Sequence, residues 1–333
     1  MIYWHQMRKA AWILATLFGL VFIGATILNA ELVAKSRSAL TAAGLAGSLP
    51  SPEARFHLLV ILPDSDDAFF AKLLEGILSG AQDAGVAMQV ERYPAADTEE
   101  AERWFDIGLR SRVDGMIMYA ARGDDVAQRA SLAKAAGVVF VAVGKDAPAG
   151  PLPCFIGSGS LLQGYQGGGI IAGSLKGAAR IGLILPSGRI DGSDENYLYK
   201  GVEASISMFR GARIVATAWS EPGLLSGEGA AAALIRSHPD INAIFCANSR
   251  DSLGAAQVLV DQNLVGRILL VGADETPELL RYLDKGVIAA SVVRNSRRIG
   301  EEALGSFSRM KAGGPDPGII EVDSVARLGG AKK

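Results

Sequence analysis

Short apolar runs and amphipathic stretches alternate along the chain from Phe56 onward. Each run is only a few residues long and rich in Val, Ile and Leu, which is typical of strands that are buried on both faces. The runs therefore predict strands at residues 56–62, 86–92, 115–119, 138–143, 180–185, 212–216, 243–246, 268–271 and 289–293.

Amphipathic patterns between these runs predict helices, for example at 69–84, 99–110, 125–136, 253–262 and 277–285. Gly85, Gly137 and Gly286 come just past such segments, where a left-handed backbone conformation costs glycine little. Strands and helices that alternate with short links predict parallel sheets with helices on both faces. So many strands fit two lobes better than one, and we expect an α/β protein with two doubly wound parallel-sheet lobes.

The amino-terminal segment has a different pattern. Residues 10–30 contain no charged side chain, and a helix needs about 20 apolar residues to cross a bilayer. Arg8 and Lys9 precede this segment and favour a cytoplasmic amino terminus. We expect a cytoplasmic stub and transmembrane anchor at 1–31 and a juxtamembrane linker at 32–55, with the bulk of the chain outside the cell membrane. A cleaved signal peptide stays open as the alternative, although the segment is longer than a usual signal core and its possible cleavage sites carry bulky residues.

Composition narrows the possible functions. The 333 residues include 33 Lys and Arg against 35 Asp and Glu, and this balance argues against nucleic acid as the main partner. The two cysteines, Cys154 and Cys246, are better explained as buried apolar residues than as a disulfide. The three histidines are not spaced as a ligand pair, so the sequence predicts no metal site.

Motifs for catalysis and for cofactors are missing from the sequence. The glycine-rich segment 157–169 lacks the GxGxxG spacing of dinucleotide-binding proteins, so we expect a crossover followed by a closely packed helix there. Neither a P-loop nor a GxSxG motif is present, and we therefore expect a protein that is not an enzyme and uses no cofactor. Asp66 and Asp67 are best explained as caps of the helix that follows. Of Phe69 and Phe70, one ring is expected in the core, and the other either joins it or stacks on a flat ligand.

Four segments carry a family resemblance. They are 59–70 (LVILPDSDDAFF), 238–248 (HPDINAIFCAN), 270–277 (LVGADETP) and 286–295 (GVIAASVVRN). In order and spacing they resemble blocks of the periplasmic sugar-binding proteins of the ribose-binding-protein type, and the match runs from about Phe56 to the end of the chain. Regulators of the lac repressor type share these lobes, but they carry a DNA-binding motif where this chain has its apolar segment.

The resemblance implies a type I periplasmic binding fold, in which two lobes joined by three crossings close on a small polar ligand. We expect crossings near Gly157, Asn295 and Gly318. Lobe one then comprises 56–157 with 295–318, and lobe two comprises 158–294 with 319–333. Carboxylates and amides would bind sugar hydroxyls, and aromatic rings would cover the C–H face. The expected ligand-binding residues are Asp67, Phe69, Phe70, Lys145, Asn248, Asp274 and Arg294.

Three departures from the family pattern bear on the ligand. Gly144-Lys145 stands where the family usually has Asp-Arg, Ser249 follows Asn248 where the family has Asp, and Arg294 stands where the family has Gln. The loss of one acidic contact and the added cation predict an acidic or phosphorylated ligand. The alternative is that Arg294 pairs with Asp274 or Asp67 and does not meet the ligand.

Two functions follow from the resemblance. The first is a membrane-anchored extracytoplasmic protein that binds a sugar or sugar-like molecule and delivers it to an ABC permease. The second is a subunit that uses the same pocket to signal ligand occupancy to a membrane histidine kinase or a chemoreceptor, because lobe closure changes the outer surface that a partner can read.

Overall fold

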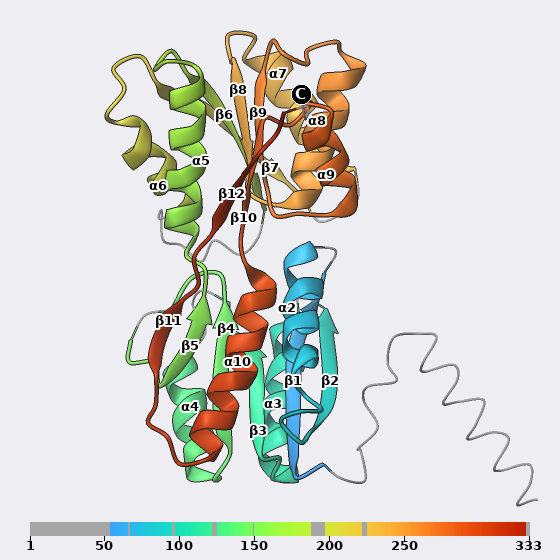
Figure 1. The fold of residues 1–333 in the computed structure, drawn as a ribbon, viewed down its shortest axis with the longest axis vertical. Coiled ribbons are helices and arrows are strands. Elements are labelled where there is room, and N and C mark those ends of the chain that lie inside the picture. The colour runs from blue at the N-terminus through green and yellow to red at the C-terminus, as the bar shows by residue number, and fades with distance from the viewer. Residues whose placement is uncertain are drawn as a thin grey trace, which may run out of the picture. The chain divides into compact units, whose positions relative to one another are not determined.

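The computed structural model describes residues 54–65, 67–94, 97–121, 125–148, 150–187, 197–221 and 225–330 (Figure 1). The expected membrane anchor, nearly all of the expected linker, and Asp66 lie outside these residues. Among the helices within the described ranges, none combines the length and the apolar character that a bilayer crossing requires.

The first sheet contains six strands in the order β11-β5-β4-β3-β1-β2, and every neighbouring pair is parallel. Its helices α2 and α10 contribute to one hydrophobic cluster, and α3 and α4 contribute to another. The strands are β1 (Phe56–Asp64), β2 (Val86–Pro94), β3 (Gly115–Tyr119), β4 (Val139–Gly144), β5 (Cys154–Gly157) and β11 (Gly318–Glu321), and the helices are α2 (Ala68–Ser79), α3 (Thr98–Ser111), α4 (Val126–Ala135) and α10 (Ser296–Lys311).

The second sheet repeats this plan in the order β12-β10-β9-β8-β6-β7, with only β12 antiparallel to its neighbour. Helices α5 and α6 lie on one side of it, and α7 to α9 lie on the other (Figure 1). The strands are β6 (Arg180–Pro186), β7 (Arg213–Ser220), β8 (Ala243–Cys246), β9 (Leu269–Ala273), β10 (Ala290–Val293) and β12 (Val325–Leu328), and the helices are α5 (Ser160–Ser174), α6 (Tyr197–Ile206), α7 (Ser226–Ser237), α8 (Ser249–Asp261) and α9 (Pro277–Asp284).

Both sheets are doubly wound, as predicted. In the first sheet β2 and β3 pair with opposite sides of β1, and in the second sheet β7 and β8 pair with opposite sides of β6. The chain order therefore reverses between β1 and β3, and again between β6 and β8. Ligands of such sheets bind at the carboxyl ends of the strands beside the reversal. The topology thus places the expected site at the carboxyl ends of β1, β3, β6 and β8, with the ends of β4, β9 and β10 next to them.

The chain passes between the two sheets three times. It crosses after β5, returns after β10, and crosses again between β11 and β12. We expected the last crossing near Gly318, but β11 pairs with β5 as far as Glu321, so the crossing lies at 322–324. This strand is short and only partly buried, and its sequence shows no distinct apolar run.

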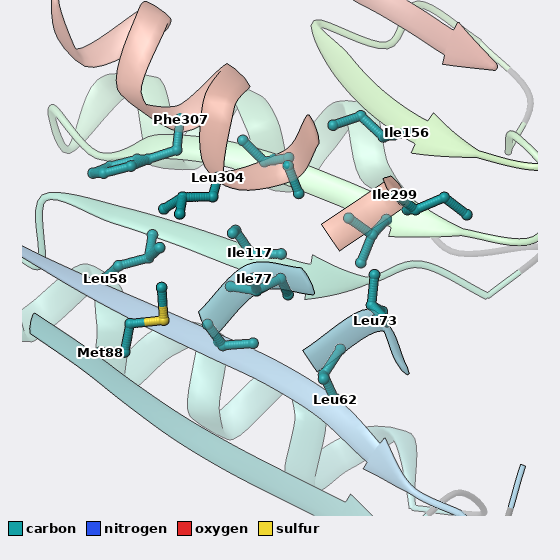
Figure 2. Packing of buried hydrophobic residues seen from close by; sticks show 14 of the residues in the cluster. Leu58, Leu62, Leu73, Ile77, Met88, Ile117, Ile156, Ile299, Leu304 and Phe307 are labelled. Carbon is teal, nitrogen blue, oxygen red and sulfur yellow. The ribbon is translucent and has the colours of Figure 1, made fainter. Parts of the chain in front are cut away.

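The apolar runs supply the core because their side chains alternate between the two faces of a sheet. Leu58, Val60 and Leu62 of β1 join the cluster under α2 and α10, whereas Leu59 and Ile61 face α3 and α4. Figure 2 shows β1 residues meeting Leu73 and Ile77 of α2 and Ile299, Leu304 and Phe307 of α10. Each fully buried aliphatic side chain stabilises the fold by roughly 1.5–3 kcal/mol.

Glycines allow two helix pairs to pack closely. A Cβ on Gly76 of α2 would lie 2.0 Å from the carbonyl oxygen of Arg297, and one on Gly300 of α10 would lie 2.1 Å from that of Leu73. Gly164 of α5 and Gly201 of α6 make equally close contacts with each other's helix. The α2–α10 contact binds the helix that follows the second crossing to the first sheet.

Other predictions of the sequence are also confirmed. Cys154 and Cys246 are buried and unpaired, and they lie in different sheets. The glycine-rich segment forms the end of β5, a short connection and helix α5. Gly85, Gly137 and Gly286 have φ values of 64°, 75° and 70°, in the left-handed region that favours glycine.

Candidate functional site

Asp67 and Lys145 meet at the carboxyl end of the first sheet. Asp67 caps α2, and its Oδ1 accepts a 3.0 Å hydrogen bond from the backbone N–H of Phe69. Lys145 directly follows β4 and donates from Nζ to Asp67 Oδ2 at 2.8 Å. Burial alone would raise the pKa of the Asp67 carboxyl, but the charges of Lys145 and Arg294 outweigh it and hold that pKa well below its usual range.

Asp274 and Arg294 form a buried ion pair at the carboxyl end of the second sheet. Asp274 follows β9 with a left-handed φ of 61°, and its backbone carbonyl accepts a 2.6 Å hydrogen bond from Ser291 Oγ. Arg294 follows β10 and binds both carboxylate oxygens of Asp274, with Nε donating to Oδ1 at 2.9 Å. Burial alone would lower the pKa of Arg294, but Asp274 and Asp67 together raise it above its usual range.

Arg294 also connects the second sheet to the first. Its guanidinium lies 3.6 Å from Asp67 Oδ1 and 5.0 Å from the centroid of the Phe69 ring. Only 2% of the Arg294 side chain is exposed. The structure therefore shows the ion pairing that the alternative interpretation of Arg294 requires, with Asp274 as its bidentate partner and Asp67 close by.

Phe69 and Phe70 are both buried. Their rings contact each other edge to face with centroids 5.3 Å apart, and Phe70 meets the ring of Tyr119 in the same way at 4.9 Å. Lys145 Nζ lies 5.6 Å from the Phe69 centroid, so two cations approach this ring. Neither phenylalanine is exposed for stacking in this structure, and their contact with a ligand stays a prediction.

Tyr119 at the end of β3 joins this cluster, although the sequence analysis did not select it. Burial raises the pKa of its hydroxyl, and the nearby Tyr93 and Asp67 raise it further. The neutral phenol is therefore its form at ordinary pH. The signal that could have identified it was its position as the last residue of a strand beside the chain reversal.

Asn248 lies at the carboxyl end of β8 and caps α8. Its Oδ1 accepts from the backbone N–H of Asp251 at 2.8 Å, and its Nδ2 donates to Asp251 Oδ2 at 2.7 Å. Asp251 was missing from the predicted site. The three-residue spacing from a helix-capping Asn to an acidic residue, similar to a capping box, was the available signal.

Two cavities among the described residues differ in their relation to the predicted site residues. A small cavity of about 40 Å³ borders Asp274, Arg294 and Asn295 at the second crossing. A larger cavity of about 580 Å³ lies among α4, the start of β4 and the end of α10. Because none of the predicted site residues lines the larger cavity, we assign the site from strand topology and hydrogen bonding.

The site is rich in hydrogen-bonding groups. Carboxylates, an amide, an ammonium group and aromatic rings gather at the carboxyl ends of the strands, and such groups recognise hydroxyls and apolar C–H faces. Among the described residues, no group of three or more His, Cys, Asp or Glu side chains could hold a metal ion.

Comparison with known proteins gives one family. The family model for the periplasmic binding protein domain matches residues 58–314. The D-allose-binding periplasmic protein of Escherichia coli is 21% identical over 253 residues, which cover 74% of this chain and 81% of that protein.

Two solved structures share the fold. An ABC transporter solute-binding protein from Burkholderia graminis in complex with D-arabinose aligns with a TM-score of 0.75 and 19% identity, covering 84% of this chain and 96% of that one. A chain of the XylFII–LytSN complex aligns with a TM-score of 0.70 and 20% identity, covering 82% and 98%. The two doubly wound lobes, the three crossings and the family match together show that this chain belongs to the periplasmic binding protein domain family.

Proposed function

We propose that this protein is an extracytoplasmic solute-binding protein that closes its two lobes on a sugar and delivers the sugar to an ABC importer. Family membership supports a binding protein. The D-allose-binding relative and the solute-binding protein in complex with D-arabinose support a sugar as the ligand. Asp67 and Lys145 of lobe one and Asn248 of lobe two would provide the main polar contacts.

The single observation that carries the choice of ligand is the pairing of charges at the site. The Lys145 ammonium group donates to Asp67. The Arg294 guanidinium donates through Nε and Nη2 to the two carboxylate oxygens of Asp274. An anionic ligand would have to compete with a carboxylate that each cation already holds. A neutral polyol can bind to the outer lone pairs and N–H groups of these pairs, so the arrangement favours a neutral sugar over an acidic one.

A thermal-shift screen of the full-length protein tests this proposal. Neutral sugars such as D-allose, D-ribose and D-arabinose are compared with D-glucuronate and D-ribose 5-phosphate. A ligand present at 100 times its Kd stabilises the folded state by about 2.7 kcal/mol, which raises the unfolding temperature measurably. We expect at least one neutral sugar to do so. A higher unfolding temperature with the acidic sugars alone would support an anionic ligand instead. No change in unfolding temperature with any sugar would contradict the proposal.

We further propose that residues 1–31 anchor the protein in the cell membrane, with 32–55 as a linker and the two lobes outside. The basis is the sequence alone, because an uncharged segment of this length preceded by Arg8 and Lys9 fits a membrane span with its amino terminus in the cytoplasm.

The second candidate function is a sensor subunit that reports sugar occupancy to a membrane histidine kinase or a chemoreceptor. Its structural support is the similar chain that occurs in a complex with a second protein, XylFII–LytSN. Deleting the gene separates the two candidates. Loss of sugar uptake supports import, whereas normal uptake with a lost transcriptional response to the sugar supports sensing.

A further inference from the structure

Asp251 is a fully buried carboxylate behind the proposed contacts of lobe two. It lies in the first turn of α8, and its side chain is 0% exposed. Oδ2 accepts from Ser220 Oγ at 2.7 Å and from Asn248 Nδ2 at 2.7 Å, and Oδ1 accepts a longer 3.5 Å bond from Arg250 Nε. This carboxylate therefore joins the end of β7 to the start of α8.

The neighbouring helix is shaped to admit this residue. A Cβ on Gly227 of α7 would lie 2.8 Å from Asp251 Cα and 3.2 Å from its Oδ1. Backbone and side chain of Asp251 therefore occupy the space that any larger residue at 227 would need. The carboxylate is held in place from three directions, by β7, α7 and α8.

The two bonds between Asp251 and Asn248 fix which way the Asn248 amide faces. If the amide turned over, its NH₂ group would face the backbone N–H of Asp251, and its oxygen would face the Asp251 carboxylate. Both contacts would be repulsive, and they would leave buried polar groups without a hydrogen-bond partner. In the observed orientation Asn248 keeps one N–H and one oxygen lone pair for another partner.

We propose that Asp251 is a positioning residue that fixes the orientation of the Asn248 amide. This orientation determines where Asn248 donates a hydrogen bond to the ligand and where it accepts one, and so it selects among sugar epimers. The inference rests on the proposed function, because it takes Asn248 as a sugar contact. An epimer that points a hydroxyl the wrong way leaves the fixed N–H of Asn248 unpaired. Sites built this way discriminate strongly against the wrong partner.

An exchange of the two residues separates positioning from stability. In the Asn248→Asp/Asp251→Asn variant, the new carboxylate can accept from the backbone N–H of residue 251 and from the new amide. Arg250 can still donate to the amide oxygen, and the Ser220 oxygen can accept from the amide nitrogen. The net charge is unchanged, but the second N–H of residue 248 is replaced by an oxygen lone pair.

The readouts are thermal unfolding and calorimetric Kd values of the full-length protein for two epimer sets, D-allose with D-glucose, and D-ribose with D-arabinose and D-xylose. We expect Asp251→Asn alone to lower the unfolding temperature, and the exchange variant to recover most of that loss. The ratio of Kd values between the best sugar and its epimers should still change by about tenfold or more in the exchange variant.

Ser220→Ala is the matched control. It removes one hydrogen bond to the same carboxylate and leaves both Asn248–Asp251 bonds intact. It should lower the unfolding temperature while the Kd ratio stays within about twofold, because the amide orientation is kept. If the exchange variant does not fold, the Kd ratio of Asp251→Asn is compared with that of Ser220→Ala. The same Kd ratio in both variants would overturn the proposal.

An exchange variant that is stable and keeps the wild-type Kd ratio would show that Asp251 has only a structural role. Failure of the wild-type protein to bind any of the sugars is a different result. It would overturn the proposed function together with this inference, whereas an unchanged ratio overturns the inference alone.

Discussion

At the scale of single residues, Arg294 is central to the electrostatics of the site, because its buried guanidinium binds both carboxylate oxygens of Asp274 and lies 3.6 Å from Asp67 Oδ1. Its position after a predicted strand was correct, and its two possible roles followed from its charge. The structure shows the contact with Asp274, which lies 20 positions earlier in the chain and has a left-handed φ of 61°. A backbone angle at one residue leaves no pattern in the sequence, and neither does the contact between Ser220 and Asp251, which lie 31 positions apart.

Removing Arg294 should destabilise the protein strongly. Arg294→Gln leaves the Asp274 carboxylate buried without its bidentate partner, and breaking a buried pair in this way costs about 3–5 kcal/mol. Chemical denaturation of both proteins measures this loss. Arg297→Gln is the control, because it disrupts solvent-exposed ion pairs and should change stability little. Equal effects of the two substitutions would contradict the structural role of the buried pair.

Asp67 predicts a dependence of stability on pH. Its folded-state pKa lies below the ordinary value of 3.8, so its ionised form stabilises the folded state. This contribution is complete above the unfolded pKa and is lost as the pH falls through the folded one. Asp67→Asn keeps a helix-capping side chain but cannot ionise. The stability difference between wild type and this variant should shrink from pH 6 towards pH 3, and a difference that grows on acidification would contradict the assignment.

At the scale of elements, the sequence predicted nine strands and missed three, of which β11 and β12 are edge strands and β5 is a buried internal strand. All nine predicted strands are present, with small shifts at their ends. The strands that were not predicted are β5, β11 and β12, which are each four residues long. All four residues of β12 are exposed, so its sequence carries no apolar run. Helix α5 was predicted only as a closely packed helix, because its glycines weaken the amphipathic pattern.

The close contact between α2 and α10 predicts that alanine at position 300 destabilises the protein, although alanine usually stabilises a helix relative to glycine. Gly300→Ala places a methyl group against the backbone of Leu73, which overpacks the contact and should cost about 2 kcal/mol or more. Gly169→Ala in α5 is the control, because a Cβ there meets nothing within 4 Å and alanine favours helices by up to about 1 kcal/mol. Denaturant titrations should show opposite signs, and a stable Gly300→Ala variant would show that the helices can separate without cost.

At the scale of the whole molecule, the fold and the family could be predicted from the sequence, but the ligand could not. Four short motifs in the right order indicated two lobes, and the match over residues 58–314 confirms the family. The departures at Lys145 and Arg294 suggested an anion because the sequence showed the cations without their partners. The proposal of a neutral sugar depends on the pairing of these cations with Asp67 and Asp274, and the charge of the ligand stays a prediction.

Membrane topology gives a prediction at the same scale. With residues 1–31 as an anchor and the amino terminus in the cytoplasm, a reporter fused after Lys333 should lie outside the cytoplasm. Alkaline phosphatase at this position should be active, and green fluorescent protein exported by the same route should be dark. Bright fluorescence with inactive phosphatase would contradict the proposed orientation.

The central claim is that the two lobes bind one neutral sugar. Isothermal titration calorimetry of the full-length protein against neutral aldoses and their acidic or phosphorylated counterparts tests it most directly. We predict saturable binding of a neutral sugar at one site per chain and much weaker binding of each anionic counterpart. Binding of the anionic sugars alone, or of none of the sugars, would contradict the account.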